Sequence, residues 1–439
     1  MPRITLIGAG SLTFAKNLIG DILSFEALSD SEIVLMDLDE DRLDEVGAVT
    51  EAMIESGDVE ATVETTTDRR EALTDTDYVF NLINVGGLEP FENEIRIPEE
   101  YGVKQAIGDT LGPGGIFRGL RTVPVMVDMA KEMEEVCPDA PLLNYTNPMV
   151  LVSWATHTAT DIDIYGLCHS IPHTAQAIAD YIDIPYDELD YWAAGINHMA
   201  WFLDIEHDGE DLYPALHKAM GDEDIYRQDT VRFEVMDHFG AFVSESSHHM
   251  SEYVPYFRTD EDRIEELVGE GYAGRMETAA YLEEWSARHR EHGSGESSID
   301  PSEATISRSD EYAARIIHSI ETGKRRRLNL NVTNETNAIG NLQDDAFVEV
   351  PALVDGTGIH PMSVGDLPEQ LAALNRTNLN VQRLAVEASL TGDRETLYRA
   401  MKLDPLTAAS ISLDEIESMT DDLLVANSEY LPQFEATGR

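Results

Sequence analysis

The first 37 residues carry the pattern that most restricts the fold of this chain. A short apolar segment, residues 4–7, runs into the turn Gly8-Ala-Gly-Ser11, a helical stretch extends to about residue 28, and a second apolar segment ends at Asp37. Glycines at the first strand–helix turn, with an acid at the end of the next strand, are typical of βαβ units that bind dinucleotides. Thr13 stands where the full fingerprint has a third glycine. We predict an α/β fold with a Rossmann-like, doubly wound parallel sheet, in which Asp37 holds a ribose hydroxyl.

Alternating helical and extended stretches continue to about residue 145. In order, the pattern predicts a helix over 40–56, strands over 61–66 and 78–84, a helix over 122–136 and a strand over 140–145. The 78–84 strand leads into Val85-Gly-Gly87, a second place for the backbone to approach a cofactor closely. Asn147, fixed by the proline after it, follows the last strand at the edge where open α/β sheets bind ligands. An ordinary Asn-Pro turn would have the same sequence.

Residues 105–118 are predicted to form an unusual loop. Four glycines and a proline surround a single acid there, Asp109, and Arg118 and Arg121 follow it. A structural turn needs about two glycines, and loops this rich in glycine inside a compact domain tend to wrap a ligand. Asp109 is therefore a candidate functional residue.

A cysteine and a histidine end two further apolar runs. Cys168 and His169 follow the run 163–167, and His198 follows the run 191–196. A thiolate and an imidazole brought together at a sheet edge make half of a site for a divalent transition metal, with positions left open for substrate. Cysteine is also among the most buried residue types, and a lone histidine is usually a satisfied core residue.

The net charge of the chain limits the kinds of molecule that it can bind. Acidic residues outnumber basic ones 84 to 30, for a formal net charge of −54, and only six of the basic residues are lysines. The acids are spread along the chain, which is typical of a solvated folded surface rather than a disordered tail. A dispersed acidic surface poor in lysine indicates adaptation to high intracellular salt, where screening removes self-repulsion. It excludes nucleic acid as a partner, because phosphate binding needs clustered cations.

Length and hydropathy indicate a large soluble protein. With 439 residues, of which 42% are hydrophobic, the chain should form two domains, which we place at 1–195 and 196–439. No apolar run approaches 18 residues and no signal-peptide pattern opens the chain, so we expect a cytoplasmic protein with no membrane partner.

The second half of the chain is predicted to be α+β. Residues 199–300 have a mixed pattern, with a cluster rich in serine and histidine at 244–258 in their middle. Beyond them the pattern indicates strands near 328–333 and 346–354 and helices around 309–321, 366–389, 394–404 and 413–428. We expect this half to pack against the first as a substrate and oligomerisation domain.

Taken in order, these motifs resemble glycoside hydrolase family 4 over nearly the whole chain. The resemblance rests on Ile7-Gly-Ala-Gly-Ser11, Val85-Gly-Gly87, Gly108-Asp109, Gly112-Pro-Gly-Gly115, Asn144-Tyr-Thr-Asn-Pro148, Gly166-Leu-Cys-His-Ser170, Gly195-Ile-Asn-His198, Ser251-Glu-Tyr-Val-Pro-Tyr256, Val348-Glu-Val-Pro351 and Gly365-Asp-Leu-Pro368. Enzymes of this family depart from two-carboxylate glycoside hydrolysis. Bound NAD⁺ oxidises the sugar at C3, a divalent metal, usually Mn²⁺, polarises the ketone, a base removes the C2 proton, the C1 group is eliminated, water adds, and C3 is reduced again.

The resemblance implies roles for particular residues of this chain. Cys168 and His198 would bind the metal, Asp109 would assist the leaving group, and Asn147 would bind the C2 and C3 hydroxyl region. A tyrosine serves as base in several members, so Tyr253 is the candidate here, with Tyr256 as the alternative. Gly8, Gly10, Ser11, Asp37 and Asn84 would line the NAD pocket. The second domain would resemble the C-terminal domain of lactate and malate dehydrogenases, and members are generally homodimers or homotetramers.

The residues after the metal cysteine indicate the sugar. Family branches that act on 6-phosphorylated sugars carry Asn or Asp after that cysteine, whereas this chain has His169 and then Ser170. Cys-His-Ser resembles the α-galactosidases, so the predicted substrate is an unphosphorylated α-galactoside with His169 in contact with it. An α-glucuronidase, α-galacturonidase or α-glucosidase of the same family stays open, because arginines near Arg96 and Arg258 could hold a sugar carboxylate.

Two readings from other classes also stay open. The strand, glycine turn and Asn-Pro pattern is shared with lactate and malate dehydrogenases, so a plain NAD-dependent dehydrogenase of a hydroxy acid is possible. Such an enzyme uses a catalytic His with an Asp and needs no Cys-His metal pair. A non-catalytic sugar or nucleotide sensor would not need Asp109, Cys168 and His198 together.

Overall fold

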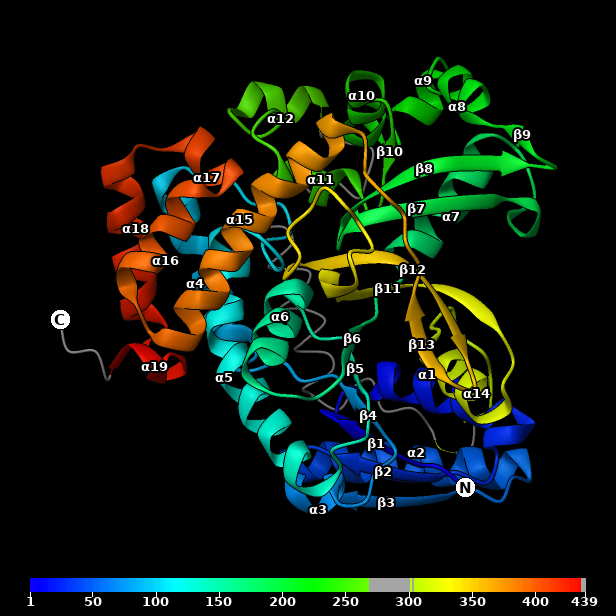
Figure 1. Ribbon diagram of the computed structural model, residues 1–439. Coiled ribbons are helices and arrows are strands. Elements are labelled where there is room, and N and C mark those ends of the chain that lie inside the picture. The colour runs from blue at the N-terminus through cyan, green and yellow to red at the C-terminus, as the bar shows by residue number, and fades with distance from the viewer. Residues whose placement is uncertain (268–300, 302–303, 436–439) are drawn as a thin grey trace.

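The computed structural model describes residues 1–267, 301 and 304–435 (Figure 1). Within that part of the chain, thirteen strands form one sheet. The strands are β1 (Arg3–Ile7), β2 (Glu32–Met36), β3 (Thr62–Thr66), β4 (Tyr78–Asn81), β5 (Leu142–Asn144), β6 (Ile164–Gly166), β7 (Asp190–Ile196), β8 (Met199–His207), β9 (Glu210–Asp211), β10 (Phe242–Val243), β11 (Arg326–Thr333), β12 (Phe347–Asp355) and β13 (Gly358–Pro361).

Helices cover both faces of this sheet (Figure 1). They are α1 (Leu12–Leu23), α2 (Glu40–Gly57), α3 (Arg69–Leu73), α4 (Leu88–Tyr101), α5 (Gly112–Val136), α6 (Met149–Ala159), α7 (Ser170–Tyr181), α8 (Tyr213–Ala219), α9 (Glu223–Tyr226), α10 (Thr230–Phe239), α11 (Ser247–Tyr253), α12 (Glu261–Leu267), α14 (Ala313–Thr322), α15 (Glu369–Thr391), α16 (Arg394–Leu403), α17 (Pro405–Ser410), α18 (Leu413–Ala426) and α19 (Pro432–Glu435). Short 3-10 turns are η1 (Glu26–Leu28), η2 (Tyr186–Glu188), η4 (Asn334–Thr336) and η5 (Ser428–Tyr430).

The N-terminal half is the predicted Rossmann-like sheet. Its six strands lie in the order β3-β2-β1-β4-β5-β6, and every neighbouring pair is parallel. The order reverses between β1 and β4, so the loops after these two strands diverge and leave a crevice at the carboxyl edge of the sheet. This confirms the fold class and fixes where a nucleotide would bind.

The sheet continues into the second half of the chain through antiparallel strands. β6 pairs with β11, then β12, β7, β8 and β10 follow, each antiparallel to its neighbour. One row of residues crosses four of these strands, since Gly166 is level with Asn331, Asn331 with Glu349, and Glu349 with Gly195. The two glycines come just before Cys168 and His198. Strand pairing between residues far apart in sequence therefore brings the two predicted metal ligands to one part of the sheet.

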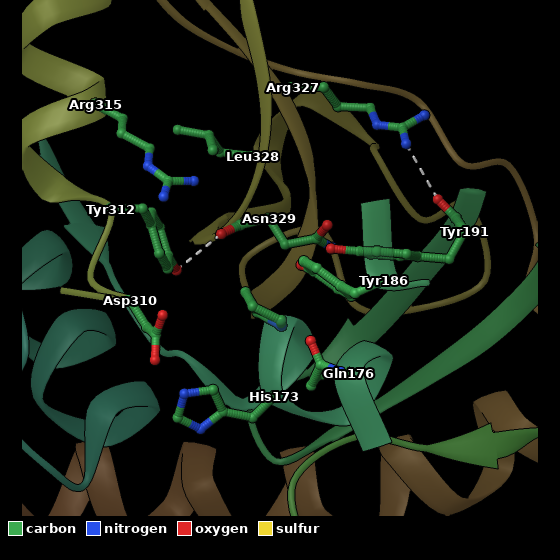
Figure 2. A pocket seen from close by; sticks show the side chains of 11 residues that line it. His173, Gln176, Tyr186, Tyr191, Asp310, Tyr312, Arg315, Arg327, Leu328 and Asn329 are labelled. Atoms are coloured by element: carbon green, nitrogen blue, oxygen red, sulfur yellow. Dashed lines mark hydrogen bonds between the residues drawn. The ribbon is translucent and has the colours of Figure 1, made fainter. Parts of the chain in front are cut away.

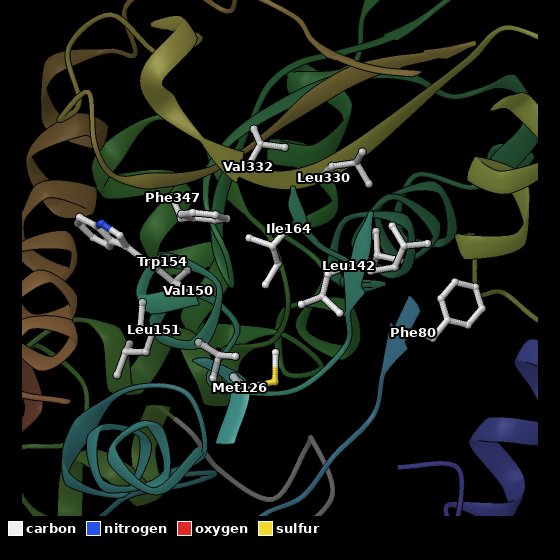
Figure 3. Packing of buried hydrophobic residues seen from close by; sticks show 14 of the residues in the cluster. Phe80, Met126, Leu142, Val150, Leu151, Trp154, Ile164, Leu330, Val332 and Phe347 are labelled. Atoms are coloured by element: carbon white, nitrogen blue, oxygen red, sulfur yellow. The ribbon is translucent and has the colours of Figure 1, made fainter. Parts of the chain in front are cut away.

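Apolar side chains from both halves meet in one core (Figure 3). Ile164 of β6 faces the same packed layer as Phe347 of β12, and Trp154 of α6 closes it from the helical side, whereas Phe80 of β4 points to the opposite face of the sheet; each of these four is buried. Burying such a side chain contributes about 1.5–3 kcal/mol relative to leaving it in water. The C-terminal helices α15–α18 pack beside α4 and α5 and brace the N-terminal half from outside (Figure 1).

Several predicted boundaries shift. α1 ends at Leu23 rather than near residue 28, and η1 follows as a separate turn. β4 ends at Asn81, so Asn84 lies in the loop that follows it. Of the mixed segment predicted over 199–300, residues 268–300 lie outside the described part. The predicted boundary at 195/196 falls within β7, and the division into two domains stays a prediction. No helix among the described residues has the length and apolarity needed to cross a membrane.

The glycine-rich stretch 105–118 was predicted to be a loop throughout, but only residues 105–111 are loop and the rest belong to helix α5. α5 already begins at Gly112, with Pro113 in its first turn, instead of starting near residue 122. A Cβ on Gly114 would lie 2.3 Å from the carbonyl oxygen of Gly108, and one on Gly115 would lie 2.4 Å from the carbonyl carbon of Thr110. These glycines let the start of α5 press against the Asp109 loop. Close packing, rather than ligand wrapping, explains them.

Candidate active site

A cavity of about 730 Å³ opens at the crevice between β1 and β4. It is lined by Ile7, Gly8, Met36, Asp37, Leu38, Thr67, Asp68, Arg69, Arg70, Ile83, Asn84, Val85, Gly86, Val125, Met129 and Glu132. Gly8, Asp37 and Asn84 thus lie where the sequence placed them. The cavity lies at the switch in strand order, the position at which open α/β sheets bind nucleotides.

Backbone geometry shapes the floor of this nucleotide cavity. Gly8 has a φ of 85°, and a Cβ there would lie 2.8 Å from the backbone nitrogen of Ile83, so only glycine fits. Gly10 donates its N–H to Oδ2 of Asp37 at 2.7 Å. Ser11, which is exposed, precedes α1, and its side chain makes no capping hydrogen bond. The first turn of α1 carries no acid, so its N–H groups can meet a pyrophosphate. These residues fit a dinucleotide such as NAD.

A buried ion pair holds the loop on the far side of that cavity. Arg121 of α5 donates from Nε to Oε1 of Glu94 at 2.7 Å and from Nη2 to Oε2 at 3.0 Å. Its Nη1 donates to the carbonyl oxygen of Val85. Both side chains are fully buried, so the pair fixes the loop that carries Asn84.

Cys168 and His198 form the centre of a second region. Cys168 Sγ lies 3.3 Å from Nε2 of His198, and both residues are buried. Asn197 and His198 form the two-residue loop between β7 and β8, where His198 has a φ of 62°. Left-handed backbone is unusual for a residue other than glycine and is found at functional sites. The hairpin therefore presents this histidine to the cysteine at the cost of local strain.

The thiol and the ring suit a divalent transition metal. Burial lowers the pKa of His198 to about 4, which keeps the ring neutral and its nitrogen lone pair available to a cation. Tyr312 fixes the cysteine from behind, because its hydroxyl accepts from the N–H of Cys168 at 3.0 Å and lies 3.0 Å from the carbonyl oxygen of Cys168. Sulfur and imidazole nitrogen are the ligands such ions prefer.

Two residues that the sequence did not single out complete this cluster. Glu245 and His249 each place one potential ligand atom within 4.8 Å of the other and of His198. His249 belongs to the cluster at 244–258 visible in the sequence, although the pattern gave it no role. Glu245 precedes α11 and has a φ of 79°, which no sequence signal indicates. His198 therefore belongs both to a pair with Cys168 and to a group of three with Glu245 and His249.

His249 lies between two carboxylates. Its Nδ1 contacts Glu245, and its Nε2 lies 3.5 Å from Oδ1 of Asp109. Burial opposes a positive charge here, but Glu245 and Asp109 raise the pKa of His249 well above its usual value. Burial by itself would raise the pKa of the Asp109 carboxyl, but His249 and Arg118 together lower it below its usual value. The arrangement is a buried imidazolium whose two ring nitrogens each lie against one carboxylate.

The remaining predicted residues surround Asp109. Asn147 donates from Nδ2 to Oδ2 of Asp109 at 3.4 Å, and Arg118 lies 3.6 Å from the same oxygen. Tyr253, which is buried, donates to Oγ1 of Thr110 at 3.0 Å. Of the two tyrosine candidates, Tyr253 is bonded to the residue next to Asp109, whereas Tyr256 is 43% exposed.

His169 lies at the outer rim of the cluster. Its Nδ1 is 3.2 Å from Glu311, its ring stacks on His173 at 4.5 Å between centroids, and contact with Glu311 raises its pKa to about 9. A second cavity, of about 300 Å³, begins at His173 (Figure 2). Tyr312 lies in its wall and donates to the carbonyl oxygen of Asn329. The same tyrosine that holds Cys168 therefore also lines this cavity.

Chemically, the cluster offers a cation site, a proton and hydroxyl-binding groups beside a nucleotide cavity. Cys168 and His198 supply the cation site, and the Asp109–His249 pair supplies the proton. That combination suits redox-assisted chemistry on a polyhydroxylated substrate. A hydroxy-acid dehydrogenase would need only the nucleotide cavity and a His–Asp pair, so it leaves the buried Cys–His pair without a purpose.

Over nearly its whole length, the chain is similar to known glycosyl hydrolases. Residues 3–184 match the sequence profile described as family 4 glycosyl hydrolase, and residues 193–407 match the profile of the family 4 glycosyl hydrolase C-terminal domain. An α-galactosidase of Bacillus subtilis is 42% identical over 99% of this chain and 100% of its own length. An α-galactosidase of Rhizobium meliloti is 38% identical over 98% and 89%. A 6-phospho-α-glucosidase from gut microorganisms, solved with NAD and Mn²⁺, superimposes with a TM-score of 0.81 at 21% identity, covering 98% of this chain and 99% of that one.

Proposed function

The chain belongs to glycosyl hydrolase family 4, and we propose that it hydrolyses unphosphorylated α-galactosides. Two α-galactosidases are similar to it over nearly the whole chain. The observation that carries the proposal is the buried Cys168–His198 pair, 3.3 Å apart, next to an acid and beside a nucleotide cavity. His169 and Ser170, which follow the cysteine, are the residues expected in branches that act on unphosphorylated sugars.

NAD⁺ and a divalent ion such as Mn²⁺, when bound, supply the hydride acceptor and the Lewis acid that the oxidation and elimination route at C3 and C2 requires. Gly8, Gly10, Ser11, Asp37 and Asn84 would hold the nucleotide. Cys168 and His198 would hold the metal. Asn147 and His169 would bind sugar hydroxyls and so orient the ring between the two.

The leaving group needs a proton when the C1–O bond breaks. Asp109 is ionised in the present arrangement, and the titratable proton donor nearest to it is His249. In the proposed reaction Asp109 therefore passes a proton from His249 to the glycosidic oxygen. Two residues that share one proton can act as acid in elimination and as base when water adds.

Tyr253 would remove the C2 proton. Burial and the acids around it raise the pKa of Tyr253 well above its usual value, so the phenol is neutral in the absence of a cation. A positive charge near the ring would favour the phenolate, which ties the base to occupation of the cation site.

The test is hydrolysis of an aryl α-galactoside with NAD⁺ and Mn²⁺ in D₂O. The expected result is activity that needs both additives, leaves NAD⁺ unconsumed and exchanges the C2 hydrogen with solvent. Activity without either additive, or a product that retains hydrogen at C2, would overturn the mechanism. Net conversion of NAD⁺ to NADH with a hydroxy acid would favour the dehydrogenase reading instead.

The second candidate substrate is a uronide, whose sugar carries a carboxylate. Arg258 is the residue that could bind that carboxylate. Arg258 is buried, and its Nη1 lies 3.5 Å from Ser251 while its Nε donates to the carbonyl oxygen of Lys104. Its Nη2 makes no hydrogen bond to the described residues, but the side chain is only 3% exposed, so a sugar carboxylate would have to be buried to reach it. We therefore expect faster turnover of aryl α-galactosides than of the matching α-galacturonides.

We also propose that this enzyme works in a salt-rich cytoplasm as a homodimer or homotetramer, with a substrate domain from residue 196 onward. The net charge of −54 and the scarcity of lysine support the salt proposal. Screening should stabilise the folded state, so the midpoint of thermal unfolding should rise steadily between low salt and molar KCl. A midpoint unchanged by KCl would count against it.

A further inference from the structure

Helix α11 and the loop that carries Asp109 touch at successive points. His249 contacts Asp109, Tyr253 bonds Thr110, and Glu252 lies between them on the same short helix. Residues 102–111, which join α4 to α5, form neither helix nor strand. The shape of this loop therefore depends on what α11 offers it.

Among these three residues of α11, Glu252 makes the largest number of hydrogen bonds to the loop. Its Oε1 accepts the N–H groups of three consecutive residues, Ala106 at 2.6 Å, Ile107 at 3.1 Å and Gly108 at 3.1 Å. Glu252 is 4% exposed. Burying a carboxyl costs several kcal/mol unless hydrogen bonds replace water, and three amides that converge on one oxygen do so. Such convergence also fixes the backbone direction of all three donors.

Asp109 is the residue next to the last donor. Gly108 has a φ of 63°, and a Cβ there would lie 2.5 Å from Cδ1 of Ile95, so the loop turns sharply just before the acid. Arg258 anchors the near end of the loop through the carbonyl oxygen of Lys104. Together with the hydrogen bonds from residues 106–108 to Glu252, this contact fixes the backbone that precedes Asp109. Without that hold, the carboxylate would be free to move away from His249.

We propose that Glu252 is a positioning residue that aims Asp109 at the glycosidic oxygen. The inference rests on the proposed function, in which Asp109 delivers the proton to the leaving group. Glu252 itself reaches the reacting atoms only through the backbone of residues 106–108. Its oxygen can accept those N–H groups whether or not the other oxygen carries a proton, so Glu252→Gln should preserve the contact while Glu252→Ala removes it.

Leaving-group dependence is the diagnostic measurement. In the wild type kcat should differ little between 2,4-dinitrophenyl α-galactoside, which leaves without a proton, and methyl α-galactoside, which needs one. Asp109→Asn and Glu252→Ala should each lose about 100-fold or more on the methyl galactoside and about 10-fold or less on the dinitrophenyl one. Glu252→Gln should stay within about 10-fold of wild type on both. Ser251→Ala is the matched control, because it removes the hydrogen bond to the carbonyl oxygen of His248 and the contact with Nη1 of Arg258, but it leaves Arg258 bonded to Lys104 and the amides of residues 106–108 with their acceptor.

Amide hydrogen exchange of residues 104–110 gives a readout that does not depend on activity. Protection should be lost in Glu252→Ala and kept in Glu252→Gln and Ser251→Ala. The inference is overturned if Glu252→Ala keeps that protection, or if it loses the same factor on both substrates while Asp109→Asn shows the leaving-group dependence. If Asp109→Asn itself lacks the dependence, the proposed role of Asp109 fails. If Glu252→Ala does not fold, Glu252→Asp, which withdraws the oxygen by one methylene, is compared with Glu252→Gln in the same assays.

Discussion

The nucleotide cavity and the Cys168 cluster adjoin on one sheet but are built in different ways. Backbone forms the cavity floor at Gly8 and Gly10, and Asp37, which Gly10 contacts, is only 27 residues further along the chain. Side chains form the cluster, and they come from the loops after α4, β6, β7 and β10 and from helix α11. The nucleotide cavity is therefore built from contacts between residues close in sequence, and its shape suits a nucleotide. The second is an assembly that depends on every element that contributes to it.

That difference implies that the two regions can be disabled separately. A change in the cluster should abolish chemistry and leave nucleotide binding intact. A change in the cavity floor should weaken nucleotide binding and leave the metal ligands in place.

Cys168→Ser should have the largest effect. Loss of the thiolate removes a principal ligand, so Mn²⁺ binding should become undetectable and kcat should fall by about 1,000-fold, equivalent to several kcal/mol of lost Lewis-acid stabilisation. NAD⁺ affinity should stay within about 2-fold, as measured by calorimetry. Cys137→Ser is the control, because Cys137 is the other buried free cysteine and lies at the end of α5. Equal losses in the two variants would mean that Cys168 is merely a core residue.

Tyr253→Phe should come next, with kcat reduced by about 100-fold or more, the range typical of losing a general base. The C2 exchange rate should fall with it, whereas Mn²⁺ and NAD⁺ binding should persist. Tyr256→Phe serves as the comparison, since Tyr256 is 43% exposed and should tolerate the change. If Tyr256→Phe were the variant that lost C2 exchange, the assignment of the base would be reversed.

Gly8→Ala tests the cavity floor. A Cβ there meets the backbone of Ile83 at 2.8 Å, and neither segment can retreat without shifting β1 or β4, so NAD⁺ affinity should fall by about 10- to 100-fold. Mn²⁺ binding should be retained. Gly87→Ala separates sterics from backbone conformation, because Gly87 also has a positive φ, of 65°, but a Cβ there would meet no atom of the described residues within 4 Å. A similar loss in both variants would attribute the effect to conformation alone.

The pH dependence of stability tests the cluster without measuring activity. The folded-state pKa of His198 is about 4, below the ordinary value of 6.5. As pH falls from about 6.5 to about 4, the unfolded chain takes up a proton that the folded chain refuses, so stability is lost across that window, by up to about 3 kcal/mol. Above about pH 6.5 this residue contributes no pH dependence. Chemical unfolding of the metal-free protein should show a steeper decline in the wild type than in His198→Gln, and parallel curves would contradict the assignment.

Local sequence pattern was enough to predict the N-terminal architecture and the parts of the site that short connections build. Gly8, Asp37 and Asn84 line one cavity because a βαβ unit brings neighbouring segments together through short connections whose geometry hardly varies, and their role in binding NAD stays a prediction. Cys168 and His198 could be proposed as partners because each directly follows a short strand. The start of α5 was missed, since glycine disfavours helix locally and only contact with the Asp109 loop repays that cost.

Completion of the cluster, in contrast, depends on long-range packing. Pairing of β6 with β11 and of β12 with β7 brings Cys168 to His198, and nothing in the pattern of either strand specifies those partners. The roles of His249, Glu245 and Glu252 likewise come from the packing of α11 against a loop more than 140 residues earlier. An acidic or histidine residue in a chain with 84 acids carries no local signal of function. Its meaning depends on which groups share its buried space, because charges interact strongly only at short range and away from water.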